Sequence, residues 1–297
     1  MKLVSQTEYL GQLFGEEEAV RMLAKAGYDG IDWSFLEVMK MSDFETRPWF
    51  LDVWKERAYR MRELADSLGV TIEQAHAPMP LSKGVEEYDS IILEKVLQTM
   101  EAASIMGVKN IVVHPMQHKV PFLNSREQMF DANVQMYKEM MPYCEKWNIT
   151  VCTENMWHEG FDRRTIINSV CADPIEFRDM IDAVNHPRFR ACLDIGHCFV
   201  CNIDPLYAIR TLGKDRIACL HVHDVDYSDD CHTLPYIRRL DWDAILRTLA
   251  EIGYEGNLTY EADSFLRGFP KDFQQEAADF MVKVGRMMIR KFEAAKA

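Results

Sequence analysis

The sequence of 297 residues contains no run of eighteen apolar residues, so nothing in it predicts a membrane-spanning helix. Its first residues, MKLVSQTEYLGQLFGEEEAV, lack the continuous apolar stretch that forms the core of a signal peptide, and we therefore expect a cytoplasmic protein. The sequence also lacks a glycine-rich phosphate loop, low-complexity tracts and a linker-like break in composition. These absences predict a single domain over residues 1–297.

Basic residues are scarce relative to acidic ones. The chain has 34 Lys and Arg against 47 Asp and Glu, which gives a formal net charge of −13. Because affinity for nucleic acid depends largely on neutralising phosphates, this balance argues against a nucleic-acid ligand. Eight cysteines in a chain of this length do not indicate a disulfide scaffold, and we expect free buried thiols. The one Cys-x-x-Cys pair, Cys198 and Cys201, has no second pair with which to form a zinc ribbon.

What the sequence does contain is a repeated junction between a helix and a strand. LAKAGYDGIDWSF near the N-terminus has a counterpart in LAEIGYEGNLTYE near the C-terminus, and each amphipathic run ends at a glycine that favours a left-handed helix cap. CEKWNITVCTEN repeats the pattern with Asn148 at that position. Strands are predicted at residues 2–7, 30–35, 71–77, 110–115, 150–155, 190–195, 217–223 and 257–262. Helices are predicted at residues 16–26, 49–68, 87–106, 125–147, 174–184, 205–213, 241–252 and 272–293.

This alternation indicates a parallel sheet covered by helices. Eight units without a break in composition favour a closed (β/α)8 TIM barrel, with an open doubly wound sheet as the alternative fold. In barrels of this class the active site lies at the carboxyl ends of the strands. Six consecutive predicted strands end there in His, Asp or Glu: His76, His114, Glu154, Asp194 with His197, His221 with His223, and Glu261.

A single histidine at a strand end is most often a hydrogen-bonded structural residue. So many converging imidazoles and carboxylates are costly to bury unless a cation neutralises them. The metal ligands we favour are Glu154, Asp194, His223 and Glu261, one from each of the last four strands. Oxygen and imidazole ligands without thiolate suit Mn²⁺, Mg²⁺, Co²⁺ or Zn²⁺.

The roles predicted for His221 and Trp157 depend on where these residues lie relative to the end of a strand. His221 and His223 point to the same face of their strand, but His223 lies nearer the mouth of the barrel, so we predict packing or a supporting role for His221. Trp157 follows the fifth strand, where its ring would either stack on a sugar or pack in the fold.

The ordered motifs HAP, VHP, TEN, LDIGH, HVHDVD, DCH and YEAD resemble those of the xylose isomerase-like TIM barrels over nearly the whole chain. This family includes sugar phosphate isomerases and epimerases, inosose dehydratase and endonuclease IV. The resemblance to its ketohexose 3-epimerases implies that the four favoured ligands hold one divalent ion. It also implies that Glu154 and Glu261 form the acid/base pair and that His197 contacts the substrate.

The resemblance to endonuclease IV implies further metal ions. Its additional zinc-binding histidines match His76 and His114, its Asp-x-His motif matches Asp230 and His232, and another of its carboxylates matches Asp226. The chain departs from the epimerases at Asp229, where they place an arginine. It departs from the nuclease in lacking basic segments that bind DNA. Because its net charge is acidic, we favour the sugar enzyme over the nuclease.

The sequence thus predicts a metal-dependent isomerase or epimerase of a sugar, sugar phosphate or related polyol. A lyase that dehydrates a keto-sugar or inosose would use the same proton abstraction. A multinuclear zinc phosphodiesterase and a non-catalytic binding barrel are the alternatives from other classes. We expect no nucleic-acid or membrane partner, and the Met-rich last helix would fit either a homo-oligomer interface or the core. Residues predicted to contact the substrate are His76, His114, His197, Asp230, His232 and Trp157.

Overall fold

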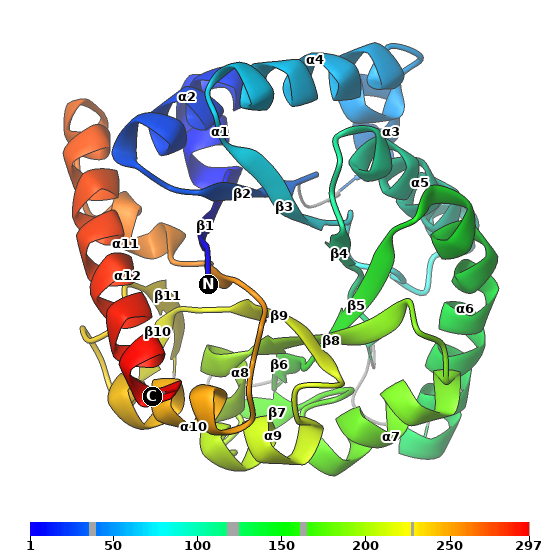
Figure 1. Cartoon of the computed structure of the whole chain (residues 1–297). Helices are drawn as coiled ribbons and strands as arrows, with labels where there is room; N and C mark the ends of the chain where they lie inside the picture. The colour runs from blue at the N-terminus through cyan, green and yellow to red at the C-terminus, as the bar shows by residue number, and fades with distance from the viewer. Residues whose placement is uncertain (36–39, 118–124, 161–164, 227–228, 297) are drawn as a thin grey trace.

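The computed structural model describes residues 1–35, 40–117, 125–160, 165–226 and 229–296. Eight parallel strands form one sheet in the order β12-β1-β2-β3-β4-β5-β8-β9, which curls into a barrel (Figure 1). A bridge between Val222 and Tyr260 joins its two edge strands, where the Val222 N–H donates to the Thr259 carbonyl at 2.9 Å. The strands are β1 (Leu3–Gln6), β2 (Gly30–Ser34), β3 (Thr71–His76), β4 (Asn110–Val112), β5 (Thr150–Glu154), β8 (Phe189–Asp194), β9 (Ile217–His221) and β12 (Leu258–Tyr260).

Helices surround the barrel and connect the strands (Figure 1). The eight predicted helical segments correspond to α2 (Glu16–Ala26), α4 (Trp54–Ser67), α5 (Glu86–Ile105), α6 (Arg126–Trp147), α7 (Pro174–Val184), α9 (Pro205–Leu212), α10 (Trp242–Glu251) and α12 (Gln274–Lys296). The predicted (β/α)8 barrel is therefore confirmed. None of the described helices combines the length and the apolar character that crossing a membrane would require.

The structure adds short elements that the sequence pattern did not predict. They are α1 (Glu8–Phe14), α3 (Asp43–Thr46), η1 (Pro48–Phe50), α8 (Ile195–Val200), α11 (Asp263–Arg267), η2 (Lys271–Phe273) and the hairpin strands β6 (Trp157–Glu159), β7 (Ile166–Asn168), β10 (Asp224–Asp226) and β11 (Asp229–Thr233). Elements of three to seven residues are too short to show a hydrophobic period. The two hairpins follow β5 and β9, so they extend from the end of the barrel where the candidate active-site residues lie.

Helix ends follow the caps that the sequence predicts. Gly27, after α2, has φ 99° and ψ 28°, a left-handed conformation that favours glycine. Asn148, after α6, takes the same left-handed region with φ 53°, which asparagine tolerates better than most residues. Because α2 and α6 end at these two residues, the chain can begin β2 and β5 shortly after them.

The barrel interior directly beneath the candidate site is partly polar. Gln74 donates to the Asp32 carboxylate at 3.0 Å, and the Thr259 hydroxyl donates to the Gln74 carbonyl at 3.4 Å. Beside them, Cys152 and Cys192 pack with Cys219 and Val112 in a buried cluster. All eight cysteines are free thiols and seven are buried, as expected. The interior is therefore packed, and the site rests on a closed floor.

Candidate metal centre and active site

The candidate site lies at the carboxyl ends of the strands, as the fold predicts. A cavity of about 410 Å³ is lined there by eight of the ten predicted site residues. The other two, Asp194 and His223, are fully buried and in contact with each other beneath it. The lining residues are His76, Met79, Pro80, Leu81, Ser82, His114, Pro115, Gln117, Glu154, Met156, Trp157, His197, Asp230, His232 and Glu261. The fold therefore brings together side chains that are up to 185 positions apart in sequence.

Three acidic side chains converge at the floor of the cavity. Glu154, Asp194 and Glu261 each offer a carboxylate oxygen to a set that also includes His221, and these ligand atoms all lie within 4.8 Å of one another. His221 Nδ1 lies 3.2 Å from Glu154 Oε1 and 3.0 Å from Glu261 Oε2. We call these four residues the carboxylate group. Each of them is buried, so water does little to screen the negative charges from one another.

His221, at the end of β9, and His223, two residues later, contact different carboxylates, and the sequence did not predict this difference. His221 reaches both glutamates, whereas His223 bonds Asp194, with its Nε2 3.0 and 3.1 Å from the two carboxylate oxygens. Both side chains face the barrel interior, so strand periodicity alone does not distinguish them. The metal-ligand role of His223 stays a prediction, and His221 is an additional candidate that the sequence reasoning placed in a supporting role.

Two imidazoles face each other at the edge of the carboxylate group. His76 Nε2 lies 2.7 Å from His114 Nε2, and His114 Nε2 lies 3.0 Å from Glu154 Oε2. Burial, with the nearby imidazoles of His114 and His221, lowers the pKa of His76 to about 3, so its ring is neutral. Two imidazole nitrogens and a carboxylate oxygen thus converge on one position, as ligands do around a metal ion. We call His76, His114 and Glu154 the imidazole pair group.

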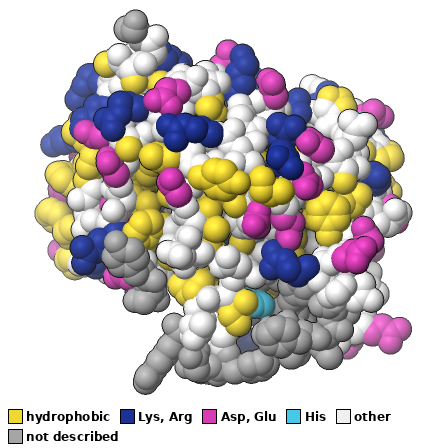
Figure 2. Space-filling model, turned by 90° about the horizontal axis from the view of Figure 1, so that it is seen from below, with side chains coloured by type: hydrophobic (Ala, Val, Ile, Leu, Met, Phe, Trp, Pro, Cys, Tyr) yellow, Lys and Arg dark blue, Asp and Glu magenta, His cyan; other side chains and the backbone are white. Residues whose placement is uncertain are grey.

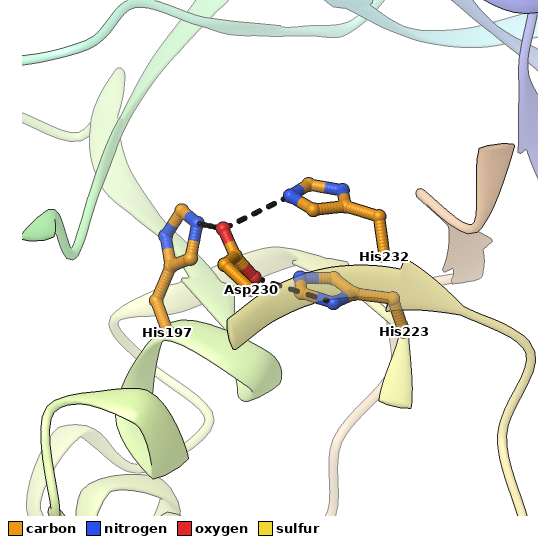
Figure 3. A group of neighbouring side chains, drawn as sticks. All are labelled: His197, His223, Asp230 and His232. Carbon is orange, nitrogen blue, oxygen red and sulfur yellow. Dashed lines mark hydrogen bonds and ion pairs between the residues drawn. The ribbon is translucent and has the colours of Figure 1, made fainter. Parts of the chain in front are cut away.

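A third set, which we call the histidine group, contains His197, His223, Asp230 and His232 (Figure 3). His197 Nε2 and His232 Nε2 lie 3.1 and 3.0 Å from the same oxygen, Asp230 Oδ2. Their other nitrogens face backbone carbonyls: His197 Nδ1 donates to Asn155 O at 2.8 Å, and His232 Nδ1 donates to Glu261 O at 3.0 Å. A carbonyl accepts only, so each Nδ1 carries a proton, and each Nε2 is the nitrogen that could bind a metal ion once it gives up its own proton.

These arrangements fit divalent cations. Among the described buried atoms that have no hydrogen-bond partner are His223 Nδ1 and Asp230 Oδ1, which lie 3.7 Å apart. Such atoms are costly to bury unless something binds them. A divalent ion would both complete their coordination and neutralise the three buried carboxylates. The carboxylate group, the imidazole pair group and the histidine group are therefore the residues that could hold metal ions.

The glutamates are kept ionised by their neighbours. Burial raises the pKa of Glu154, but the imidazoles of His221 and His114 outweigh it and hold the pKa well below its usual range. For Glu261, burial is likewise outweighed by His221 and then His232, and the pKa is lowered. In the histidine group, burial lowers the pKa of His232, but Asp230 raises it to about 10. The imidazoles of His221 and His232, whose own pKa values are raised by the neighbouring carboxylates, thus place positive charge beside these glutamates.

Residues without titratable side chains also shape the site, and the sequence analysis did not single them out. Asn155 donates its side-chain N–H to Asp194 O and accepts from the Asp194 N–H, both at 2.9 Å, which fixes the end of β8. Gln6 donates to Glu261 at 3.3 Å. The sequence could have indicated Asn155, because it directly follows the candidate ligand Glu154 in TEN.

Asp226, which the resemblance to endonuclease IV suggested as a further ligand, lies opposite Asp229 in the β10–β11 hairpin. It is outside the described cavity lining and ligand groups.

Gly196 leaves room for His223. A methyl group at this position in α8 would overlap the His223 ring, so we expect Gly196→Ala to displace that imidazole. The expected result is a loss of divalent-ion affinity of at least about tenfold, measured by calorimetric titration. Gly11→Ala is the matched control, because its added methyl meets nothing closer than 3.9 Å. Equal ion affinity in both variants would contradict this role of Gly196.

The comparisons with known proteins agree with the fold. The family model described as xylose isomerase-like TIM barrel matches residues 20–284. The chain belongs to this family. An uncharacterized protein of Methanocaldococcus jannaschii is 27% identical over 207 residues, covering 68% of the chain and 67% of the relative. An uncharacterized protein of Sinorhizobium fredii is 22% identical over 172 residues, covering 57% of the chain and only about half, 52%, of the relative's length.

Several solved structures share the barrel. A D-tagatose 3-epimerase-like protein has a TM-score of 0.76 at 19% identity, with all of both chains covered. A D-psicose 3-epimerase determined in the presence of D-fructose has a TM-score of 0.73 at 16% identity, covering 97% of this chain and 99% of the other. An IOLI protein with a bound zinc atom has a TM-score of 0.71 at 16% identity, covering 98% of each. At these identities the likeness establishes the fold.

Proposed function

We propose that this protein is a divalent-metal-dependent isomerase or epimerase of a sugar or related polyol. The observation that carries the proposal is the pair of buried, ionised glutamates at the floor of the cavity, Glu154 and Glu261, which both face one position now taken by His221 Nδ1. Two carboxylates that line the same cavity suit the removal and return of a proton. The epimerase names of two structural neighbours support the same class of reaction.

In this mechanism one glutamate accepts the proton from the carbon beside the substrate carbonyl. The other glutamate returns a proton, either to the opposite face of the same carbon or to the adjacent one, which distinguishes epimerisation from isomerisation. His197 and His232, at the cavity wall, hold substrate hydroxyls in position. A bound divalent ion would polarise the carbonyl and stabilise the negative charge that develops when the proton leaves. The carboxylate group, with His223 contacting Asp194, would hold that ion.

The cavity lining indicates the kind of substrate. Met79, Leu81, Met156 and Trp157 form an apolar side, which suits the C–H faces of a sugar, while the histidines and carboxylates provide polar partners. None of the described lining residues is Lys or Arg. An uncharged ketose or polyol therefore fits this lining better than a sugar phosphate does. The same proton abstraction would also serve a dehydratase, which product analysis distinguishes.

The experiment is to incubate the protein with a panel of ketoses in D₂O, supplying Mn²⁺, Co²⁺, Mg²⁺ or Zn²⁺ in turn. NMR should show deuterium entering the carbon next to the carbonyl, together with the epimer or isomer. Because exchange reports proton abstraction directly, it is detected even where the equilibrium lies toward the starting sugar. No exchange with any ketose and any of these ions would reject the proposal.

A second candidate is a multinuclear zinc phosphodiesterase, favoured by the presence of three ligand groups rather than one. The imidazole pair group and the carboxylate group share Glu154, so this residue could contribute to more than one metal site. Elemental analysis separates the candidates: one ion per chain supports the isomerase, and three zinc ions support the hydrolase. The surface argues against a nucleic-acid substrate, since basic side chains are interspersed with acidic ones on the face in Figure 2 and the net charge is −13.

A further inference from the structure

The two hairpins that extend from the barrel are joined by one side-chain hydrogen bond. Trp157 begins β6, and its indole N–H donates to Asp230 Oδ2 of β11 at 2.9 Å, although the residues are 73 positions apart. Trp157 is half-buried, whereas the Asp230 side chain is only 7% exposed. A charge-assisted hydrogen bond at such a shielded position is stronger than one at the surface.

The indole is one of three donors to the same oxygen in the ion-free chain. The other two are His197 Nε2 and His232 Nε2 (Figure 3), while Asp230 Oδ1 is buried without a hydrogen-bond partner. An imidazole nitrogen that binds a metal ion cannot donate a hydrogen bond from the same atom. If the histidine group holds an ion, both histidines therefore stop donating to Asp230. Among the described donors to Oδ2, the indole N–H of Trp157 is the one that remains.

Trp157 also forms part of the cavity wall. Its ring lines the cavity together with Asp230, His197 and His232, and it meets His197 edge-on, with ring centroids 6.5 Å apart at 76°. One side chain thus presents an apolar ring to the cavity and its N–H to a candidate metal ligand. The orientation of this ring depends on the Asp230 carboxylate, and the orientation of that carboxylate depends on the ring.

We infer that Trp157 is a positioning residue for the histidine group, and that it couples divalent-ion binding at His197, Asp230 and His232 to polyol binding against its ring. The inference goes beyond the proposed function, because it adds an ion at the histidine group to the one that the carboxylate group would hold. An ion that fixes Asp230 fixes the indole against which the polyol packs. By linkage, a polyol that holds the indole strengthens ion binding by the same factor.

The test is a zinc titration of the full-length protein, with chelator competition used to measure each dissociation constant. Trp157→Phe keeps an aromatic ring but removes the N–H donor. We expect this variant to lose about 10–100-fold in affinity at one class of site, the range typical of losing a hydrogen-bond partner of a metal ligand. Addition of D-fructose as the polyol probe should tighten zinc binding to the wild type and not to the variant. Trp54→Phe on α4, away from the cavity, is the matched control and should bind as the wild type does.

A double-mutant cycle separates positioning from a general disturbance of the hairpin. If Trp157 acts through Asp230, then Trp157→Phe should weaken zinc binding no further once Asp230→Asn is present. Additive losses, or wild-type zinc affinity in Trp157→Phe, would overturn the inference. Neither measurement requires turnover, so a protein that shows the coupling but exchanges no ketose proton would refute the proposed reaction and leave this inference standing.

Discussion

Replacing Glu154 with glutamine is expected to lower turnover of the sugar substrate by about 10²–10⁴-fold, the scale of losing a positioned base. Glu154 belongs to both the carboxylate group and the imidazole pair group, and its Oε1 also lies 3.3 Å from His197 Nδ1. Glutamine has the same shape but accepts no proton and carries no charge. The variant therefore loses both the proton acceptor and part of the charge that would attract a divalent ion. Measurement of kcat by NMR on the exchanging ketose checks this result.

The control for this experiment is the same substitution at the opposite end of the barrel. Glu73 lies on β3 away from the cavity, where it pairs with Lys2 at 2.6 Å. Glu73→Gln should keep wild-type turnover, with only a small change in stability. Near-wild-type turnover by Glu154→Gln would remove Glu154 from the mechanism, provided that its melting temperature and circular dichroism show a native fold.

Removing bound metal with a chelator is expected to lower the melting temperature by about 10 °C. An ion present at about a thousand times its dissociation constant contributes about 4 kcal/mol to folding, because it binds the native state alone. For a chain of this size, each kcal/mol corresponds to about 2–4 °C. The physical cause is the set of buried carboxylates, Glu154, Asp194 and Glu261, which repel one another more strongly without the ion. Differential scanning calorimetry before and after dialysis against EDTA measures the shift.

Restoring individual ions then tests the ligand chemistry. Zn²⁺ and Co²⁺ suit the imidazole nitrogens, whereas Mg²⁺ prefers oxygen ligands and would use the carboxylate group alone. Re-addition should therefore raise the melting temperature more with Zn²⁺ than with Mg²⁺. An unchanged melting temperature, in a protein that also contains no metal by elemental analysis, would instead favour a non-catalytic binding barrel.

The main architecture was readable from sequence because each βα unit carries its own local signals. Strand β5, for example, is a short run that is preceded by Asn148 in a left-handed cap and ends within the polar TEN. The β6–β7 and β10–β11 hairpins could not be predicted from the sequence. Strands of three to five residues such as β6 and β10 have no distinguishing period, and their pairing depends on contacts made only after the barrel closes.

The sequence by itself determined the barrel and predicted that the candidate residues lie at the carboxyl ends of its strands, facing inward, since side chains of a strand alternate with a period of two residues. From the sequence we expected ten candidate residues to lie together at that end of the barrel. Only the tertiary structure decided how they are grouped: His221 against both glutamates, His223 against Asp194, and Trp157 against Asp230. The reason is that contacts across the barrel depend on the stagger between strands and on the conformation of the hairpins. Both are set by packing between distant segments, which no local pattern encodes.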